Sequence, residues 1–141
     1  MSDRNHSPNA TVAPALRVSL SDVAVDDVLL QAAHDAVASG WWSMGPRVAA
    51  FEHEFAEMCG VSHAFVVANG TAAIHIALLA TGIGPGDEVI VPSLTFVAAA
   101  NMVLAVGATP VLCDIVCPHD LNLDPADVAA AVTPATKAIM P

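Results

Sequence analysis

Hydrophobic residues recur along this chain with two alternating periods. Helical spacing predicts helices at Asp26–Ser39, from Pro46 to Gly60, at Thr71–Thr81, at Phe96–Val106, and from Asp124-Pro125 onward. Short apolar runs bounded by turn residues predict buried strands at Ala64–Ala68, Glu88–Val91, Pro110–Cys113 and Lys137–Met140. Strands that alternate with helices indicate crossover connections, so we expect an α/β fold with a mostly parallel sheet.

The composition narrows the class of protein. Residues 1–20 are polar and contain prolines, which predicts a mobile N-terminal arm ahead of a domain at 21–141. The net charge is -10 with only 4 basic residues, which excludes nucleic acid and anionic membrane surfaces as partners. The N-terminus has no apolar signal region and no apolar stretch is long enough to span a membrane. Three cysteines form no even disulfide framework, so we expect a soluble, cytoplasmic protein.

The balance of apolar to charged residues is unusual. Hydrophobic residues make up 55% of the chain and charged residues 13%, where roughly a quarter charged is typical of a globular domain. Alanine accounts for part of this excess. The remainder predicts an apolar face that packs against another domain or subunit.

Three polar segments follow predicted strands. They are Asn69-Gly70-Thr71, Pro92–Phe96 and Asp114. Ligands of open parallel sheets bind at the carboxyl ends of the strands, so we expect these segments to share one edge.

The segment Gly70-Thr71-Ala72 has the residues of a phosphate cradle. A helix N-terminus leaves N–H groups unpaired, glycine permits close approach to the backbone, and Thr71 adds a hydroxyl donor. The same residues also fit an ordinary turn followed by an N-cap. Phe96 offers a ring that could stack on a flat ligand, although taken alone it fits a core aromatic residue better.

Other candidate signatures are weaker. The glycines of Gly82–Asp87 follow a helix and precede a strand, the reverse of the dinucleotide fingerprint, and no phosphate-binding P-loop motif occurs. Cys113, Cys117 and His119 have no fourth ligand at suitable spacing, so we predict no metal site. His75 fits a core or supporting histidine, and Asp114 fits either a structural or a supporting role.

From Gly40 to Pro141 the sequence resembles the N-terminal part of DegT/StrS-type sugar aminotransferases. The matching residues are Trp42 with Gly45-Pro46, Phe51-Glu52, Asn69–Ala73, Gly84–Val89, Pro92-Ser93 with Thr95-Phe96, Gly107–Val111 with Asp114, and Thr136–Ile139. The resemblance implies a three-layer α/β/α, aspartate aminotransferase-like fold, of which this chain holds an incomplete part, and a pyridoxal 5'-phosphate (PLP) cofactor.

The resemblance also implies roles for individual residues. Gly70, Thr71 and Ala72 would contact the cofactor phosphate, and Phe96 would stack on its pyridine ring. Trp42 and Ser43 would approach the nucleotide-sugar substrate, which is a looser match. The implied reaction transfers an amino group, usually from glutamate, to a nucleotide-linked keto sugar, in polysaccharide or secondary-metabolite biosynthesis. Related enzymes are typically homodimers.

The chain departs from the family pattern in its lysines. Its single lysine, Lys137, matches a structural Thr-Lys-Ala-Ile position, not the lysine that binds PLP covalently. We therefore expect a truncated large domain that has no catalytic residue and is inactive alone. A sugar dehydratase of the same family, in which histidine replaces that lysine, and a non-catalytic binding or assembly remnant remain alternatives.

Overall fold

The computed structural model describes residues 24–141, so the predicted N-terminal arm lies outside the described residues. The chain divides into two compact units, Met1–Ala49 and Ala50–Pro141. Helix α1 (Asp27–Ala38) belongs to the first unit. Helix α2 (Pro46–Cys59) begins in the first unit and continues into the second.

Helix α1 begins and ends where its sequence predicts. The Asp26 side chain caps it by accepting a hydrogen bond from the Leu29 N–H at 2.8 Å. After Ser39, Gly40 has a φ of 70°, a left-handed conformation that glycine adopts without steric cost. The cap and the terminating glycine together confirm the predicted helix.

The second unit is built on a parallel sheet. Its elements are α3 (Gly70–Ala80), β1 (Glu88–Pro92), α4 (Ala98–Ala105), β2 (Thr109–Cys113), β3 (Ile115–Cys117), β4 (Asp120–Leu123), α5 (Pro125–Ala131) and β5 (Thr136–Ile139). The strand order is β2-β1-β5, and both pairings are parallel. The register runs from Glu88 beside Thr109 to Pro92 beside Cys113, so β1 and β2 end together.

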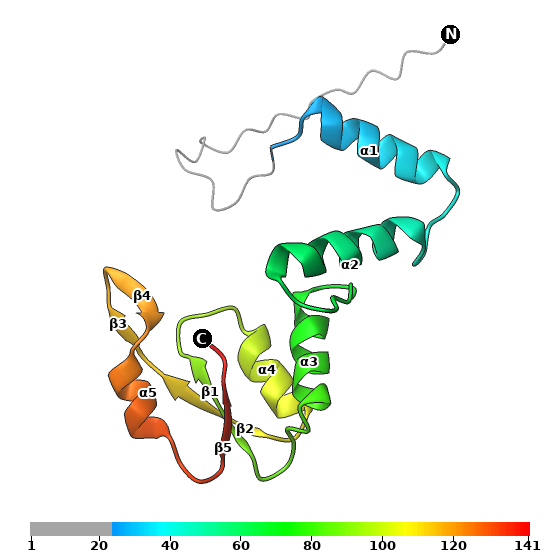
Figure 1. Cartoon of the computed structure of the whole chain (residues 1–141). Coiled ribbons are helices and arrows are strands. Elements are labelled where there is room, and N and C mark those ends of the chain that lie inside the picture. The colour runs from blue at the N-terminus through cyan, green and yellow to red at the C-terminus, as the bar shows by residue number, and fades with distance from the viewer. Residues whose placement is uncertain (1–23) are drawn as a thin grey trace, which may run out of the picture. The chain divides into compact units, whose positions relative to one another are not determined.

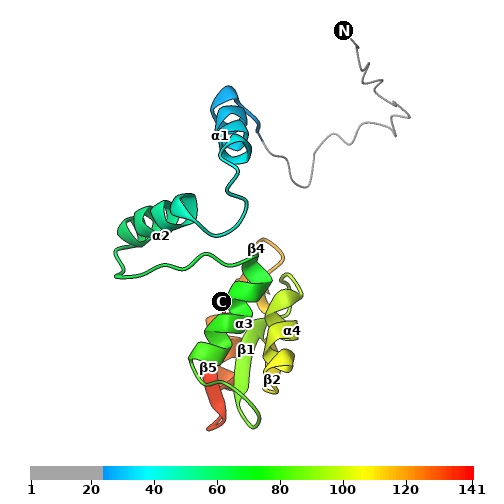
Figure 2. The same ribbon diagram turned by 90° about the vertical axis from the view of Figure 1, so that its right-hand side faces the viewer.

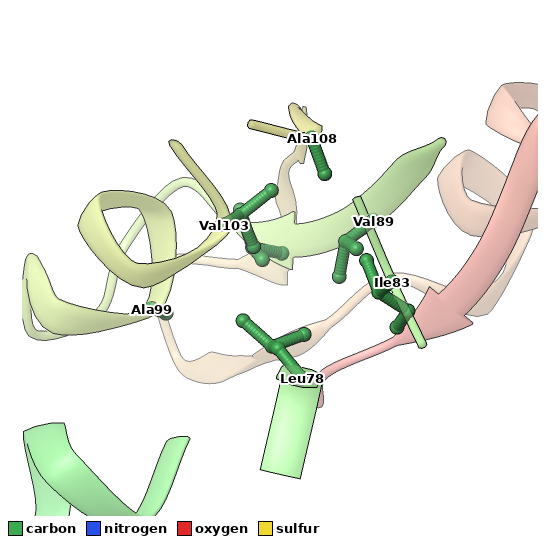
Figure 3. Packing of buried hydrophobic residues seen from close by; sticks show 7 residues of the cluster. Leu78, Ile83, Val89, Ala99, Val103 and Ala108 are labelled. Carbon is green, nitrogen blue, oxygen red and sulfur yellow. The ribbon is translucent and has the colours of Figure 1, made fainter. Parts of the chain in front are cut away.

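Helices cover both faces of this sheet. Helices α3 and α4 lie side by side on one face and α5 lies on the other (Figures 1 and 2). The core between the sheet and the α3–α4 layer is apolar (Figure 3); its buried members are Leu78, Ile83, Val89, Val91, Ala99, Val103 and Ala108. The predicted three-layer α/β/α fold with a parallel sheet is confirmed.

The strand predicted at Ala64–Ala68 is wrong. The segment is irregular, and Phe65 is 83% exposed. An extended segment becomes a strand only when a neighbour pairs with its backbone, and no strand of residues 24–141 pairs here. The Val66 N–H instead donates to the Glu52 carboxylate at 2.8 Å.

Two further details depart from the sequence pattern. Strands β3 and β4 form an antiparallel hairpin that periodicity did not predict, since their three and four residues are too short to show a period. Helix α4 begins at Ala98, two residues later than predicted, which leaves Phe96 in the connection after β1. Among residues 24–141, no helix has the length and apolar character that a membrane span requires.

Candidate cofactor-binding site

The topology brings three segments to the carboxyl edge of the sheet. Helix α3 leads through a turn to the start of β1, so its opposite end, the N-terminus, lies at the edge where β1 finishes. Helix α4 connects the end of β1 to the start of β2 and packs against α3 in the same direction (Figure 1). The N-termini of both helices, the segment Ser93–Val97 and Asp114 therefore share one edge.

The N-terminus of α3 has two open donors. Asn69 is the N-cap, and its side-chain oxygen accepts from the Ala72 N–H at 2.9 Å. The Asn69 carbonyl accepts from the next N–H, that of Ala73, at 3.1 Å. Within residues 24–141 the N–H groups of Gly70 and Thr71 donate to no protein acceptor. The two open donors point to Gly70 and Thr71, more than Ala72, as the place for an anion.

Within residues 24–141, neither conformation nor packing explains a glycine at position 70. Its φ is not in the left-handed region, and a Cβ built on it would have no heavy atom within 4 Å. Neither backbone conformation nor packing therefore requires the missing side chain. Open space directly beside two free N–H groups is what close approach of a phosphate requires.

Phe96 lies outside the core that residues 24–141 form. The residue is 76% exposed, so the described part of the chain does not bury it. Its neighbours Leu94 and Val97 are also exposed, at 56% and 58%. The connection between β1 and α4 thus presents apolar surface at the edge that holds the α3 N-terminus, as a platform for a flat ligand would.

Hydrogen bonds order the ends of β1 and β2. The Ser93 N–H donates to the Cys113 carbonyl at 2.8 Å, and the Ser93 hydroxyl donates to the Asp114 carboxylate at 3.3 Å. The Asp114 N–H in turn donates to the Asp127 carboxylate at 2.7 Å. Asp114 therefore has a structural role at this edge.

Sequence reasoning missed Asp127. It lies in the first turn of α5, three residues after the N-cap Asp124. An acidic residue there is commonly explained by the helix dipole, so position alone did not distinguish it.

The pKa of the Cys113 thiol is raised. Burial is the largest cause, and the nearby Asp127 carboxylate adds to it through its charge and as a hydrogen-bond acceptor. Cys113 is 1% exposed and therefore remains a protonated thiol at neutral pH.

Trp42 and Ser43 lie in the first unit, in the connection between α1 and α2. The hollow there has a volume of about 190 Å³; it is lined by Ser39, Trp41, Ser43, Gly45, Pro46, Arg47 and Val48. Trp41 is fixed by a 2.8 Å bond from its indole N–H to the Met44 carbonyl, and its ring occupies the space that a Cβ at Gly45 would need. Trp42 is 80% exposed and does not line the hollow. Substrate contact by Trp42 and Ser43 stays a prediction.

Lys137 lies at the other edge of the sheet. It is the second residue of β5, whose start pairs with Glu88 at the start of β1. The length of a strand therefore separates this lysine from the carboxyl edge.

His75 is half-buried one turn after Thr71 and makes no hydrogen bond within residues 24–141. The same residues contain no cluster of His, Cys, Asp and Glu that could hold a metal.

Known proteins resemble this chain over most of its length. GDP-perosamine synthase from Caulobacter vibrioides is 59% identical over 99 residues, which are 70% of this chain and 26% of that protein. The spore coat polysaccharide biosynthesis protein SpsC from Bacillus subtilis is 51% identical over 112 residues, 79% of this chain and 28% of that protein. The chain spans about a quarter of the length of the curated relatives it matches.

Solved structures of aminotransferases also resemble this chain. The "putative sugar aminotransferase Spr1654" from Streptococcus pneumoniae matches in its PLP form with a TM-score of 0.77 and 29% identity, over 86% of this chain and 31% of that one. The same protein in its PMP (pyridoxamine phosphate) form matches equally well. The predicted cofactor, PLP, is confirmed for the family. The model of the DegT/DnrJ/EryC1/StrS aminotransferase family matches residues 23–141, and this chain belongs to that family.

Proposed function

We propose that this chain forms the phosphate- and ring-binding part of a PLP-dependent sugar aminotransferase. The observation that carries the proposal is the open N-terminus of α3, with free N–H groups at Gly70 and Thr71 and open space where a Cβ would lie. The family match and the PLP form of a similar structure support PLP as the source of this phosphate.

Backbone donors supply most of the attraction for this phosphate. Lys137 is the only Lys or Arg in residues 50–141, and it belongs to the opposite edge of the sheet. The dianion is therefore stabilised by the positive end of the α3 dipole, the two N–H groups and the Thr71 hydroxyl. Because these are partial charges at an exposed edge, binding should weaken as salt concentration rises.

Phe96 provides the second contact by lying against the pyridine ring. An exposed ring at a strand end loses water-accessible surface when a flat ligand covers it, and stacking adds about 0.5–1.5 kcal/mol beyond that burial. When bound, PLP serves as an electron sink for reactions at the carbon that carries the amino group. The residues of this chain bind and orient it.

We propose that the 141-residue chain alone binds the cofactor without catalysing transfer. The described edge offers no amine that could bond covalently to PLP, since Lys137 belongs to the amino edge of the sheet. This agrees with a binding role for the polypeptide by itself. A glutamate-dependent half-reaction by the purified chain would contradict it.

The substrate is inferred from the relatives. The name of the relative GDP-perosamine synthase refers to a nucleotide-linked amino sugar. This supports a nucleotide-linked keto sugar as the amino acceptor and an amino acid such as glutamate as the donor. We further propose that the protein forms a homodimer. Large exposed apolar side chains support this, among them Phe51, Phe55 and Met58 on one helix, at 55%, 43% and 74% exposure.

Ligand-induced stabilisation tests the proposal. PMP has no aldehyde and cannot react with lysine, so it reports only non-covalent binding. A ligand that binds the folded state at ten times its Kd stabilises that state by about 1.4 kcal/mol. We expect PMP to raise the Tm of the chain and pyridoxamine, which lacks the phosphate, to raise it much less. Equal shifts, or no shift with either compound, would refute the phosphate site.

A further inference from the structure

Asp127 links the helix on one face of the sheet to the ligand-facing edge. It comes from α5, and its carboxylate accepts from the Asp114 N–H at 2.7 Å, immediately after β2. The Asp127 carboxylate thus holds the residue that directly follows the end of β2.

Asp114 passes this constraint to the next strand. Its carboxylate accepts from the Ser93 hydroxyl at 3.3 Å and from its own neighbour, the Ile115 N–H, at 2.8 Å. Its carbonyl accepts from the Asp124 N–H at 3.0 Å. The backbone N–H, the carbonyl and the side chain of Asp114 therefore all have partners, which restrain its carboxylate beside Ser93.

Ser93 is the first residue of the connection that carries Phe96. The Ser93 N–H extends the β1–β2 ladder by donating to the Cys113 carbonyl at 2.8 Å. Beyond Ser93, the next four residues are exposed until Ala98 and Ala99 enter the core. The direction of the Ser93–Val97 segment is therefore set at Ser93 and at the start of α4.

We propose that Asp127 is a positioning residue that holds the ring-binding segment through the contacts Asp127–Asp114–Ser93. This inference rests on the proposed PLP site, since it assigns Phe96 to the ring. It predicts that loss of Asp127 weakens the ring contact and leaves the phosphate contact at α3 intact. Those two effects can be measured separately.

The test compares PMP with inorganic phosphate in the wild type and four variants. Asp127→Ala removes the acceptor for the Asp114 N–H. Asp127→Asn keeps an acceptor oxygen and should rescue binding. Asp124→Ala is the matched control, because it removes the α5 cap, a 2.8 Å bond from the Ala126 N–H, without removing Asp127.

We expect Asp127→Ala to weaken PMP binding between about twofold and tenfold. Its affinity for inorganic phosphate should stay that of the wild type, as should both affinities of Asp127→Asn and Asp124→Ala. Ser93→Ala, at an exposed position, breaks the far end of the same contacts and should reproduce the selective loss. An unchanged PMP affinity in Ser93→Ala, an equal loss in Asp124→Ala, or an equal loss for phosphate would each overturn the proposal.

Hydrogen exchange separates this inference from the proposed function. Without any ligand, the Ser93 amide should exchange faster in Asp127→Ala than in Asp124→Ala, since only the former releases Asp114. If the wild type binds no PMP but this difference is seen, the proposed function fails and the contacts remain. If the wild type binds PMP and the exchange rates are equal, the positioning role is wrong.

Discussion

The bond between Glu52 and Val66 predicts a measurable loss of stability. The Val66 N–H is partly buried and donates to the Glu52 carboxylate at 2.8 Å, across 14 residues of sequence. It holds the irregular segment that leads to Asn69 and the α3 N-terminus. Glu52→Ala would leave this N–H without its acceptor.

The magnitude follows from the type of bond and its exposure. A hydrogen bond to a charged group contributes about 1.5–3 kcal/mol, and partial exposure to water reduces this to about 1–2 kcal/mol. With an m-value of about 2 kcal/mol/M in urea, the unfolding midpoint should fall by about 0.5–1 M. Glu52→Gln keeps an uncharged acceptor and should lose about half as much.

Glu54→Ala is the matched control. Glu54 lies on the same helix, is exposed, and forms no hydrogen bond within residues 24–141. Urea unfolding measures the free energies, and hydrogen exchange at the Val66 amide locates the effect. If Glu52→Ala and Glu54→Ala differ by less than about 0.5 kcal/mol, and the Val66 amide exchanges equally in both, the reasoning about this bond is wrong.

Four further predictions concern the core, the helix cap and, twice, the buried thiol. Val103→Ala should lower the free energy of unfolding in urea by about 2 kcal/mol, because Val103 is 0% exposed. Leu104→Ala, at a 59% exposed position, should lower it by less than about 0.5 kcal/mol. Equal losses would contradict the assigned core. Asn69→Ala should cost about 1 kcal/mol through the lost cap, seen as lower helicity on heating, whereas an unchanged Tm would refute the cap. A thiol reagent at pH 8 should modify exposed Cys59 within the folded chain and Cys113 only after unfolding. Since the folded pKa of Cys113 is raised, its contribution to stability is fully present below the ordinary value of 9.0 and is lost as pH rises through the folded pKa, so Cys113→Ala should flatten the alkaline fall in Tm.

Much of the fold follows from local sequence signals. Asp124 caps the helix that it precedes, and Gly40 ends α1 in a left-handed conformation. These features depend on neighbouring residues only, so sequence alone predicts them. The run at Ala64–Ala68 misled because strand formation depends on a distant partner, and Glu52 provides the contact here.

Some residues of the candidate site can likewise be predicted from local sequence, and others cannot. Phe96 follows from strand-end placement and the family motif, whereas Gly70 and Thr71 follow from the helix N-terminus and that motif, since the strand predicted before them is not formed. Asp127 does not, because its contact with Asp114 spans 13 residues and depends on how α5 packs against β2. The pairing of the Ala72 N–H with Asn69 is likewise a matter of cap geometry, and it leaves Gly70 and Thr71 as the open donors.

One comparison tests the phosphate site most directly. Thr71→Asp and Ala73→Asp both add a carboxylate to the first turn of α3, where the helix dipole favours it, but the two positions differ by about 200° around the helix. Calorimetric titration with PMP should show at least about a tenfold loss of affinity in Thr71→Asp, from charge repulsion, and wild-type affinity in Ala73→Asp. Wild-type affinity in Thr71→Asp, or an equal loss in both variants, would contradict a phosphate held at the N-terminus of α3.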